Sequence, residues 1–122
     1  MLKGIRTIVY HVENLEEAKL WYSEIFGIKP YFDESFYVGF NIGGYELGLD
    51  PSFAEYSGGN NSITYWKIEE IDQAFEHFKS KNVIIHQEIH SVGDGIRLGS
   101  IRDPFGNVIG LIEITSSQSH AD

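Results

Sequence analysis

The feature of this chain that most constrains its fold is an internal repeat, because two similar halves must build two similar structures. Residues 12–15 align with residues 68–71 at an offset of 56, and residues 47–49 align with residues 109–111 at an offset of 62. The six additional residues of the second half must lie between these blocks, and we expect them in a loop around residues 90–95. Each half alone would expose apolar faces, so we expect the halves to pair, within one chain or by exchange between two chains.

The hydrophobic periodicity predicts the same order of elements, βαβββ, in both halves. The first helix is expected between an N-cap at Asn14 and a stop at Gly27, and the second between Ile71 and about Asn82. Strands are expected at residues 5–12, 28–33, 35–42, 45–50, 62–68, 83–89, 95–102 and 107–114. The sequence therefore predicts an α+β fold made of two βαβββ modules.

The length of 122 residues fits a single domain. We divide residues 1–115 into a first module (1–50), a linker (51–61) and a second module (62–115). The linker is polar and rich in glycine, serine and asparagine, as surface loops are. Residues 116–122 are polar and are expected to form a flexible tail.

Composition excludes several classes of function. The net charge of −9 and the absence of a basic stripe argue against nucleic acid as a partner. The acidity either attracts a cationic ligand or only keeps the protein soluble. The chain has no cysteine, which excludes disulfides, zinc–thiolate sites and cysteine nucleophiles. We find no signal peptide and no apolar stretch of membrane-spanning length, so we expect no membrane association and a cytoplasmic location.

Two blocks of sequence resemble a known family. Residues 12–27 combine a polar turn, an aromatic pair and a terminal glycine, and residues 103–107 have the sequence Asp-Pro-Phe-Gly-Asn. Together with the duplication, they resemble the vicinal-oxygen-chelate superfamily of glyoxalases, bleomycin-resistance proteins and dioxygenases, over roughly residues 5–114. The resemblance implies a curved mixed sheet with a cleft, helices on its outer face, a small-molecule ligand and a homodimer.

The same resemblance implies where a metal ion would be held. In the family's metal enzymes, His, Gln or Glu side chains from the first and last strands of both modules converge on one divalent ion. The corresponding positions here are Thr7, Gly48, Ile63 and Gly110, of which only Thr7 has an oxygen on its side chain. We therefore expect no metal site, no cofactor and no assigned catalytic residue.

Strand alternation predicts which side chains line the cleft. The residues expected to bind a ligand are Thr7, Val9, His11, Glu46, Gly48, Asp50, Ile63, Tyr65, Lys67 and Gly110. The residues expected to face the helices as core are Ile8, Tyr10, Leu47, Leu49, Thr64 and Trp66. His11 is either an acid–base or ligand-contacting group or a surface histidine at a strand end. Glu46 and Asp50 either form an acidic lining or are solvated hairpin residues.

These observations favour a metal-free protein that binds a small molecule in the sheet cleft, as the family's antibiotic-sequestering members do. One alternative is a lyase, isomerase or dioxygenase of the same superfamily that uses atypical metal ligands, such as His11 with Glu46 or Asp50, or acid–base groups alone. Another is an accessory or regulatory module with a vestigial cleft. His86 and His90 are four residues apart on an expected strand, where they would share a face but lie too far apart for a metal pair.

Overall fold

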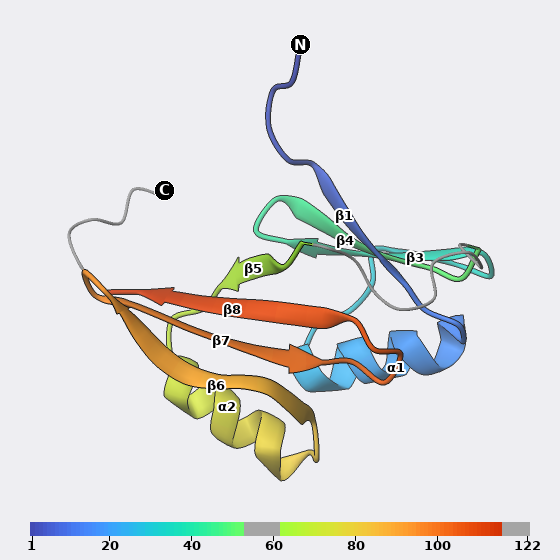
Figure 1. Cartoon of the computed structure of the whole chain (residues 1–122). Coiled ribbons are helices and arrows are strands. Elements are labelled where there is room, and N and C mark those ends of the chain that lie inside the picture. Colours follow the sequence, from blue (N-terminus) through green and yellow to red (C-terminus); the bar gives the residue numbers. More distant parts are fainter. Residues whose placement is uncertain (53–61, 116–122) are drawn as a thin grey trace. The chain divides into compact units, whose positions relative to one another are not determined.

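Both halves of the chain fold with the predicted order of elements (Figure 1). The computed structural model describes residues 1–52 and 62–115, so most of the predicted linker and the whole predicted tail lie outside the described residues. The first half contains β1 (Thr7–His11), α1 (Leu15–Phe26), β2 (Phe32–Glu34), β3 (Tyr37–Ile42) and β4 (Tyr45–Asp50). The second half contains β5 (Thr64–Lys67), α2 (Ile71–Ser80), β6 (Ile84–Gly93), β7 (Ile96–Arg102) and β8 (Val108–Ile114).

Each half forms its own four-stranded mixed sheet, and the two sheets have the same topology. The strand orders are β1-β4-β3-β2 and β5-β8-β7-β6. In each sheet the first strand of the half pairs in parallel with the last one, and the other neighbours are antiparallel. The chain divides into two compact units, residues 1–58 and 59–122. The predicted α+β fold of two βαβββ modules is confirmed, with a separate sheet in each module.

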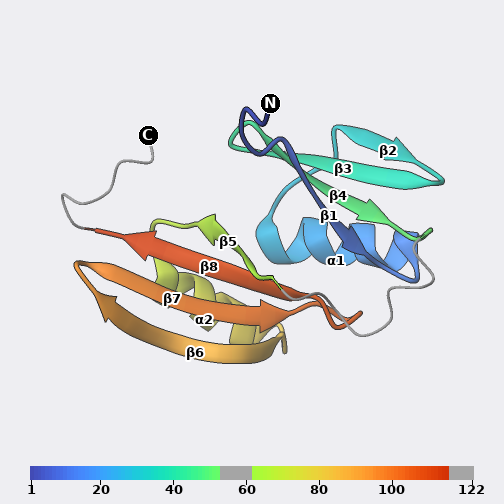
Figure 2. The same cartoon turned by 45° about the horizontal axis from the view of Figure 1, so that its top comes forward.

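Helix α1 covers one face of the first sheet (Figure 2). Its start and end follow from local chemistry, because Asn14 Oδ1 accepts a 3.0 Å hydrogen bond from the Glu17 amide and Gly27 ends the helix in the left-handed region. Fully buried Tyr22 stacks against Tyr10 of β1 and Phe40 of β3, with ring centroids 6.1 and 6.4 Å apart. Of the six predicted core positions, Tyr10, Leu47 and Leu49 are buried, whereas Ile8, Thr64 and Trp66 are half-buried.

Helix α2 covers one face of the second sheet in the same way. Its buried residues are Ile71, Phe75 and Phe78, and the sheet contributes buried Ile101, Ile109 and Leu111. The Phe75 ring lies so close to the backbone of β7 that a Cβ at Gly99 would be 2.5 Å from its Cζ. Each module thus buries its apolar residues between its own helix and its own sheet.

The additional residues of the second half lie in the β6–β7 hairpin. Phe32 pairs with Gly39, seven residues on, whereas the corresponding pair in the second sheet is Gln87 and Ser100, thirteen residues on. The hairpin is therefore six residues longer, as the offsets of the repeat require. The expectation of a loop around residues 90–95 was wrong in form, because strand pairing continues to Gly93 and the extra length is irregular, bulged strand.

The Asp-Pro-Phe-Gly-Asn turn between β7 and β8 is organised by its first residue. Asp103 is 2% exposed, and its Oδ1 accepts hydrogen bonds from the amides of Phe105 and Asn107 at 2.9 and 2.8 Å. Its Oδ2 accepts a 2.8 Å bond from the side-chain amide of Asn107, and the Gly106 amide closes the turn onto the Asp103 carbonyl. A buried carboxylate with these donors fixes the register in which β8 begins.

In the part of the chain that the structure describes, neither α1 nor α2 combines the length and the apolar character needed to cross a bilayer.

Candidate ligand-binding site

Strand pairing in the first module brings together six of the residues predicted to bind a ligand. The parallel register of β1 and β4 pairs Thr7 with Glu46, Val9 with Gly48, and His11 with Asp50. Because side chains alternate along a strand and the intervening Tyr10, Leu47 and Leu49 are buried on the α1 side, these six positions belong to the opposite sheet face.

Glu46 is the centre of a polar cluster on this face. The residue is only 9% exposed, and its carboxylate accepts a hydrogen bond from the hydroxyl of Tyr31 at one oxygen and of Tyr37 at the other. Arg6 Nη1 lies 3.3 Å from Glu46 Oε1 and donates a 2.7 Å hydrogen bond to Thr7 Oγ1. Arg6, Tyr31, Tyr37 and Glu46 are called the Glu46 cluster below.

The contacts within the Glu46 cluster hold the carboxylate in its ionised form. The hydrogen bonds from Tyr31 and then Tyr37 lower the pKa of Glu46, against the opposing effect of its burial. The hydrogen bond to Glu46 raises the pKa of Tyr31, and burial followed by the same carboxylate raises the pKa of Tyr37. The Glu46 carboxylate therefore keeps its negative charge, bound by phenols that keep their protons at neutral pH and paired with the Arg6 guanidinium.

Two glycines form the floor on which this cluster lies. Gly39 of β3 pairs with Gly48 of β4. Because neither residue has a side chain, neighbouring side chains can pack directly against the sheet backbone. A Cβ at Gly39 would be 3.4 Å from both the Glu46 carboxyl carbon and the Tyr31 ring, an ordinary contact. A Cβ at Gly48 would overlap the phenol of Tyr37, so the Tyr37 ring takes the space of the missing side chain.

A small polar pocket adjoins the cluster. Its volume is about 150 Å³, and it is lined by Arg6, Tyr31, Asn41, Gly44, Tyr45 and Glu46. This space is sufficient for a group of a few heavy atoms and too small for a whole drug-sized molecule. The pocket therefore suits recognition of one polar end of a larger ligand.

The second module brings together its own subset of the predicted residues. Tyr65 pairs with Gly110, and Lys67 pairs with Ile112, whereas Ile63 lies just before β5 and takes no part in the ladder. The Tyr65 ring lies over the backbone of its partner strand, since a Cβ at Gly110 would be 2.5 Å from Tyr65 Cδ1. In both modules, a tyrosine thus covers the glycine of the last strand.

The two histidines of β6 have separate partners. His86 Nδ1 lies 2.8 Å from the hydroxyl of buried Ser100, and His90 Nδ1 lies 3.0 Å from the carbonyl of Glu88. The ladder of β6 shifts register between Gln87 and His90, so regular alternation does not hold across the pair. The sequence-based expectation of one common face was therefore too simple.

The residues at the family's metal positions do not fit a metal ion. Thr7 alone offers an oxygen, Ile63 is apolar, and the two glycines offer no donor. The space that a donor side chain would occupy at Gly48 or Gly110 is filled by the ring of Tyr37 or Tyr65. Within residues 1–52 and 62–115, no group of three or more His, Asp or Glu side chains is placed to hold a metal ion.

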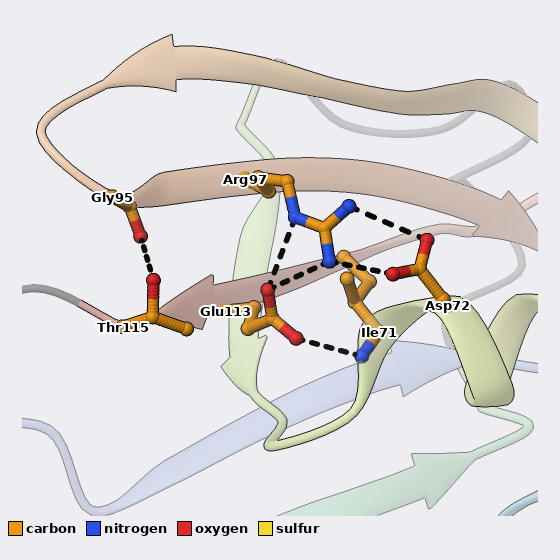
Figure 3. Close-up of polar contacts among 6 residues, drawn as sticks. All are labelled: Ile71, Asp72, Gly95, Arg97, Glu113 and Thr115. Atoms are coloured by element: carbon orange, nitrogen blue, oxygen red, sulfur yellow. Dashed lines mark hydrogen bonds and ion pairs between the residues drawn. The ribbon is translucent and has the colours of Figure 1, made fainter.

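A second charged cluster has a structural role at the start of α2 (Figure 3). Glu113 is 6% exposed, and its Oε2 accepts a 3.1 Å hydrogen bond from the Ile71 amide. Arg97 binds Glu113 Oε1 through Nε and Nη2 at 3.1 and 3.0 Å, and it reaches Asp72 at 2.7 Å. Since Glu70 makes no side-chain cap, the carboxylate of Glu113 provides it from the sheet.

Three members of the Glu46 cluster, namely Arg6, Tyr31 and Tyr37, were not among the residues predicted from the sequence. A signal for Tyr37 was present, because the Gly43-Gly44 hairpin sets Asn41 opposite Glu46 and Gly39 opposite Gly48. Alternation along β3 then places Tyr37 on the same face as Gly39. Tyr31 precedes β2, and its position depends on the path of the chain after α1, for which the sequence has no comparable signal.

Comparison with known proteins agrees with this architecture. Residues 4–111 match the model of the Glyoxalase/Bleomycin resistance protein/Dioxygenase superfamily. No curated protein sequence matches the chain.

Solved structures show the same fold at low sequence identity. The lactoylglutathione lyase of Agrobacterium tumefaciens has a TM-score of 0.75 at 21% identity, covering 92% of this chain and 94% of its own. The fosfomycin resistance protein FosX of Listeria monocytogenes has a TM-score of 0.77 at 21% identity, covering 94% of this chain and 96% of its own. A superfamily member from Sphaerobacter thermophilus has a TM-score of 0.76 at 20% identity, covering 92% of this chain and 98% of its own. The duplicated βαβββ architecture and the match over residues 4–111 show that this chain belongs to the Glyoxalase/Bleomycin resistance protein/Dioxygenase superfamily.

Proposed function

We propose that this protein binds a small molecule without a metal ion, on the sheet face that carries the Glu46 cluster. The observation that carries the proposal is the chemistry of the four metal positions, Thr7, Gly48, Ile63 and Gly110. Three of them have no donor side chain, and tyrosine rings cover both glycines. The polar groups that remain on this face are suited to binding and orientation of a ligand.

The remaining predicted ligand contacts are proposed for each unit by itself. In the first unit, Val9 is 42% exposed and offers apolar surface, and His11 and Asp50 pair at the end of β1 and β4 and add polar groups. In the second unit, Tyr65 is 39% exposed and offers aromatic surface, and Lys67 of β5 offers a cationic group.

An enzyme of the same superfamily is the first alternative, and the named relatives from Agrobacterium tumefaciens and Listeria monocytogenes motivate it. The strand register separates the atypical metal ligands considered for it. His11 pairs directly with Asp50, whereas Glu46 lies opposite Thr7, four residues from His11, or about 13 Å at the usual rise of a strand. Among the described residues, the His11–Asp50 pair is not joined by a third His, Asp or Glu that could complete a metal site. Glu46 is also held ionised, which makes it a poor proton donor near neutral pH.

A vestigial module is the second alternative. The tyrosines over Gly48 and Gly110 favour it, because side chains of the protein itself fill part of the face. The pocket beside Glu46 opposes it, because a polar recess with a fixed charge remains.

The first test is the metal content of untagged protein after incubation with Ni²⁺, Zn²⁺ or Mn²⁺ and dialysis. We expect a value near zero per chain, because the donor groups are missing. A value near one per chain would contradict the proposal and make the enzyme the leading hypothesis.

The second test is calorimetric titration with bleomycin as a probe of antibiotic sequestration, followed by mass spectrometry of the recovered ligand. Saturable binding with the ligand intact supports sequestration, whereas a chemically altered ligand argues for the enzyme.

We also propose a homodimer, which the resemblance to the family implies, and a cytoplasmic location. Sedimentation equilibrium over a range of protein concentrations tests the first of these expectations. A monomer at all concentrations would contradict it.

A further inference from the structure

The pocket beside Glu46 contains a positively charged group of the protein itself. Arg6 lies just before β1, and its guanidinium reaches Glu46 Oε1 at 3.3 Å while the side chain stays 78% exposed. Its guanidinium also donates a 2.7 Å hydrogen bond to the neighbouring Thr7 hydroxyl. An ion pair with one long contact and an exposed partner is weakly held, in contrast to the two tyrosine hydroxyls that bind the same carboxylate.

The carboxylate in this pocket retains capacity for a cation. Each carboxylate oxygen has two acceptor sites. Oε1 receives Tyr31 and Arg6, and Oε2 receives Tyr37. If Arg6 leaves, the position at Oε1 opens toward the pocket, while the negative charge stays fixed by the tyrosines. The carboxylate is 10% exposed, so a cation that contacts it is partly shielded from water.

The lining of the pocket matches a planar cation. Its lining includes Tyr31, Tyr45 and Asn41 beside Glu46, its surface is mostly polar, and its volume is about 150 Å³. Guanidinium groups pair with carboxylates through a fixed planar set of donors and also stack on aromatic rings. The Asn41 side-chain amide is uncharged and therefore does not repel a cation.

From this arrangement we infer that the Glu46 pocket recognises the guanidinium group of a small molecule, and that Arg6 occupies this position in the ligand-free protein. The inference rests on the proposed function, since it names the ligand class for the same sheet face. Arg6 then acts as an internal competitor, because a ligand must displace it before it reaches Glu46. Substitution of Arg6 should therefore strengthen binding of the ligand, although Arg6 is also one of the residues that line the pocket.

The experiment uses methylguanidinium as the probe and uncharged N-methylurea as its near-isosteric control, both titrated into the full chain at constant ionic strength. Amide chemical shifts of Gly39, Gly44 and Gly48 report binding. We expect saturable shifts with a millimolar Kd for methylguanidinium, because so few atoms make contact, and no saturation for N-methylurea.

Three variants separate the inference from non-specific attraction. Glu46→Gln keeps the shape and removes the charge, and we expect binding at least about ten-fold weaker. Glu88→Gln removes the same charge from an exposed side chain of the second unit, and we expect no change. Arg6→Gln removes the competitor, and we expect binding about two- to five-fold tighter, the range that an exposed ion pair implies.

Equal binding of methylguanidinium by wild type and Glu46→Gln would overturn the inference, as would weaker binding by Arg6→Gln. If Glu46→Gln does not fold, as dispersion of its amide spectrum would reveal, the Arg6→Gln result decides alone. Failure here is distinguishable from failure of the proposed function. If the protein binds other small molecules but shows no preference for guanidinium, only the inferred ligand class is wrong. If it binds one metal ion per chain, the proposed metal-free function itself is wrong.

Discussion

At the scale of single residues, the most informative feature is the pairing of a tyrosine with a glycine in both modules. Tyr37 lies over Gly48, and Tyr65 lies over Gly110. The glycine alone would leave a gap on the sheet, and the tyrosine alone would clash with any larger residue. The two therefore depend on each other, which gives the pair a measurable thermodynamic coupling.

The first prediction concerns this coupling. Gly48→Ala should lower the free energy of unfolding by about 1–3 kcal/mol, because the new methyl group overlaps the Tyr37 phenol. Urea denaturation measures the loss. In a Tyr37→Ala background, the same substitution should cost much less. Gly39→Ala is the matched control, since its Cβ would have its nearest atoms at 3.4 Å, and it should cost less than Gly48→Ala. An equal cost of Gly48→Ala in both backgrounds would disprove the coupling.

The second prediction concerns the pH dependence of Glu46. Its pKa is lowered in the folded state, so the stability that it contributes is present above the ordinary pKa of 4.5 and is lost as the pH falls through the lowered value. The difference in unfolding free energy between wild type and Glu46→Gln should therefore shrink as the pH is lowered below about 4.5. Denaturation curves of both proteins between neutral and acid pH measure it. A difference that stays constant, or grows, on acidification would contradict the assignment.

At the scale of elements, α1 and α2 begin with different kinds of cap. Asn14 caps α1 from the adjoining residue, whereas Glu113 caps α2 from β8 across 42 residues of sequence. Helix α2 is therefore tied to its own sheet at the N-terminus by a carboxylate that Arg97 also holds. The negative charge there also complements the positive end of the helix dipole.

The third prediction tests this distant cap. Glu113→Ala should destabilise the protein by about 1–3 kcal/mol, because it leaves the Ile71 amide and part of Arg97 without an acceptor. Amide hydrogen exchange should increase in the first turn of α2. Glu70→Ala serves as the control, since that side chain makes no cap bond, and it should change stability by less than about 0.5 kcal/mol. Equal effects of the two substitutions would refute the role of Glu113.

At the scale of the whole molecule, the net charge of −9 is the dominant property. Excess charge of one sign destabilises a compact state by self-repulsion, and salt screens that repulsion over about 10 Å at 0.1 M. The same charge increases the local concentration of cations, which agrees with the ligand class inferred for the Glu46 pocket.

The fourth prediction follows from this charge. Raising sodium chloride from about 10 to 200 mM at neutral pH should increase the urea midpoint of unfolding, because screening reduces the repulsion. At a pH near the calculated isoelectric point of 4.9, the same salt step should have a much smaller effect. A decrease in stability with salt at neutral pH would show that specific ion pairs, such as those of Arg97, outweigh the general repulsion.

The sequence by itself determined the features that depend on neighbouring residues. The repeat, the element order, the Asn14 cap, the Gly27 stop and the turn at residues 103–107 all have short-range physical causes, and all are present in the structure. The absence of donor side chains at Gly48, Ile63 and Gly110, three of the four positions that the family resemblance implies for a metal ion, also required no coordinates.

Only the tertiary structure decided which side chains occupy the space above the glycines. Tyr31 and Tyr37 reach Glu46 from outside β4, and Glu113 reaches Ile71 from another part of the chain. Such contacts depend on the register between strands and on side-chain rotamers, and a change of one residue in register would move every side chain to the other face. Burial then strengthens these contacts, because the Glu46 carboxylate, which would be solvated on an exposed strand, is here fixed, charged and shielded.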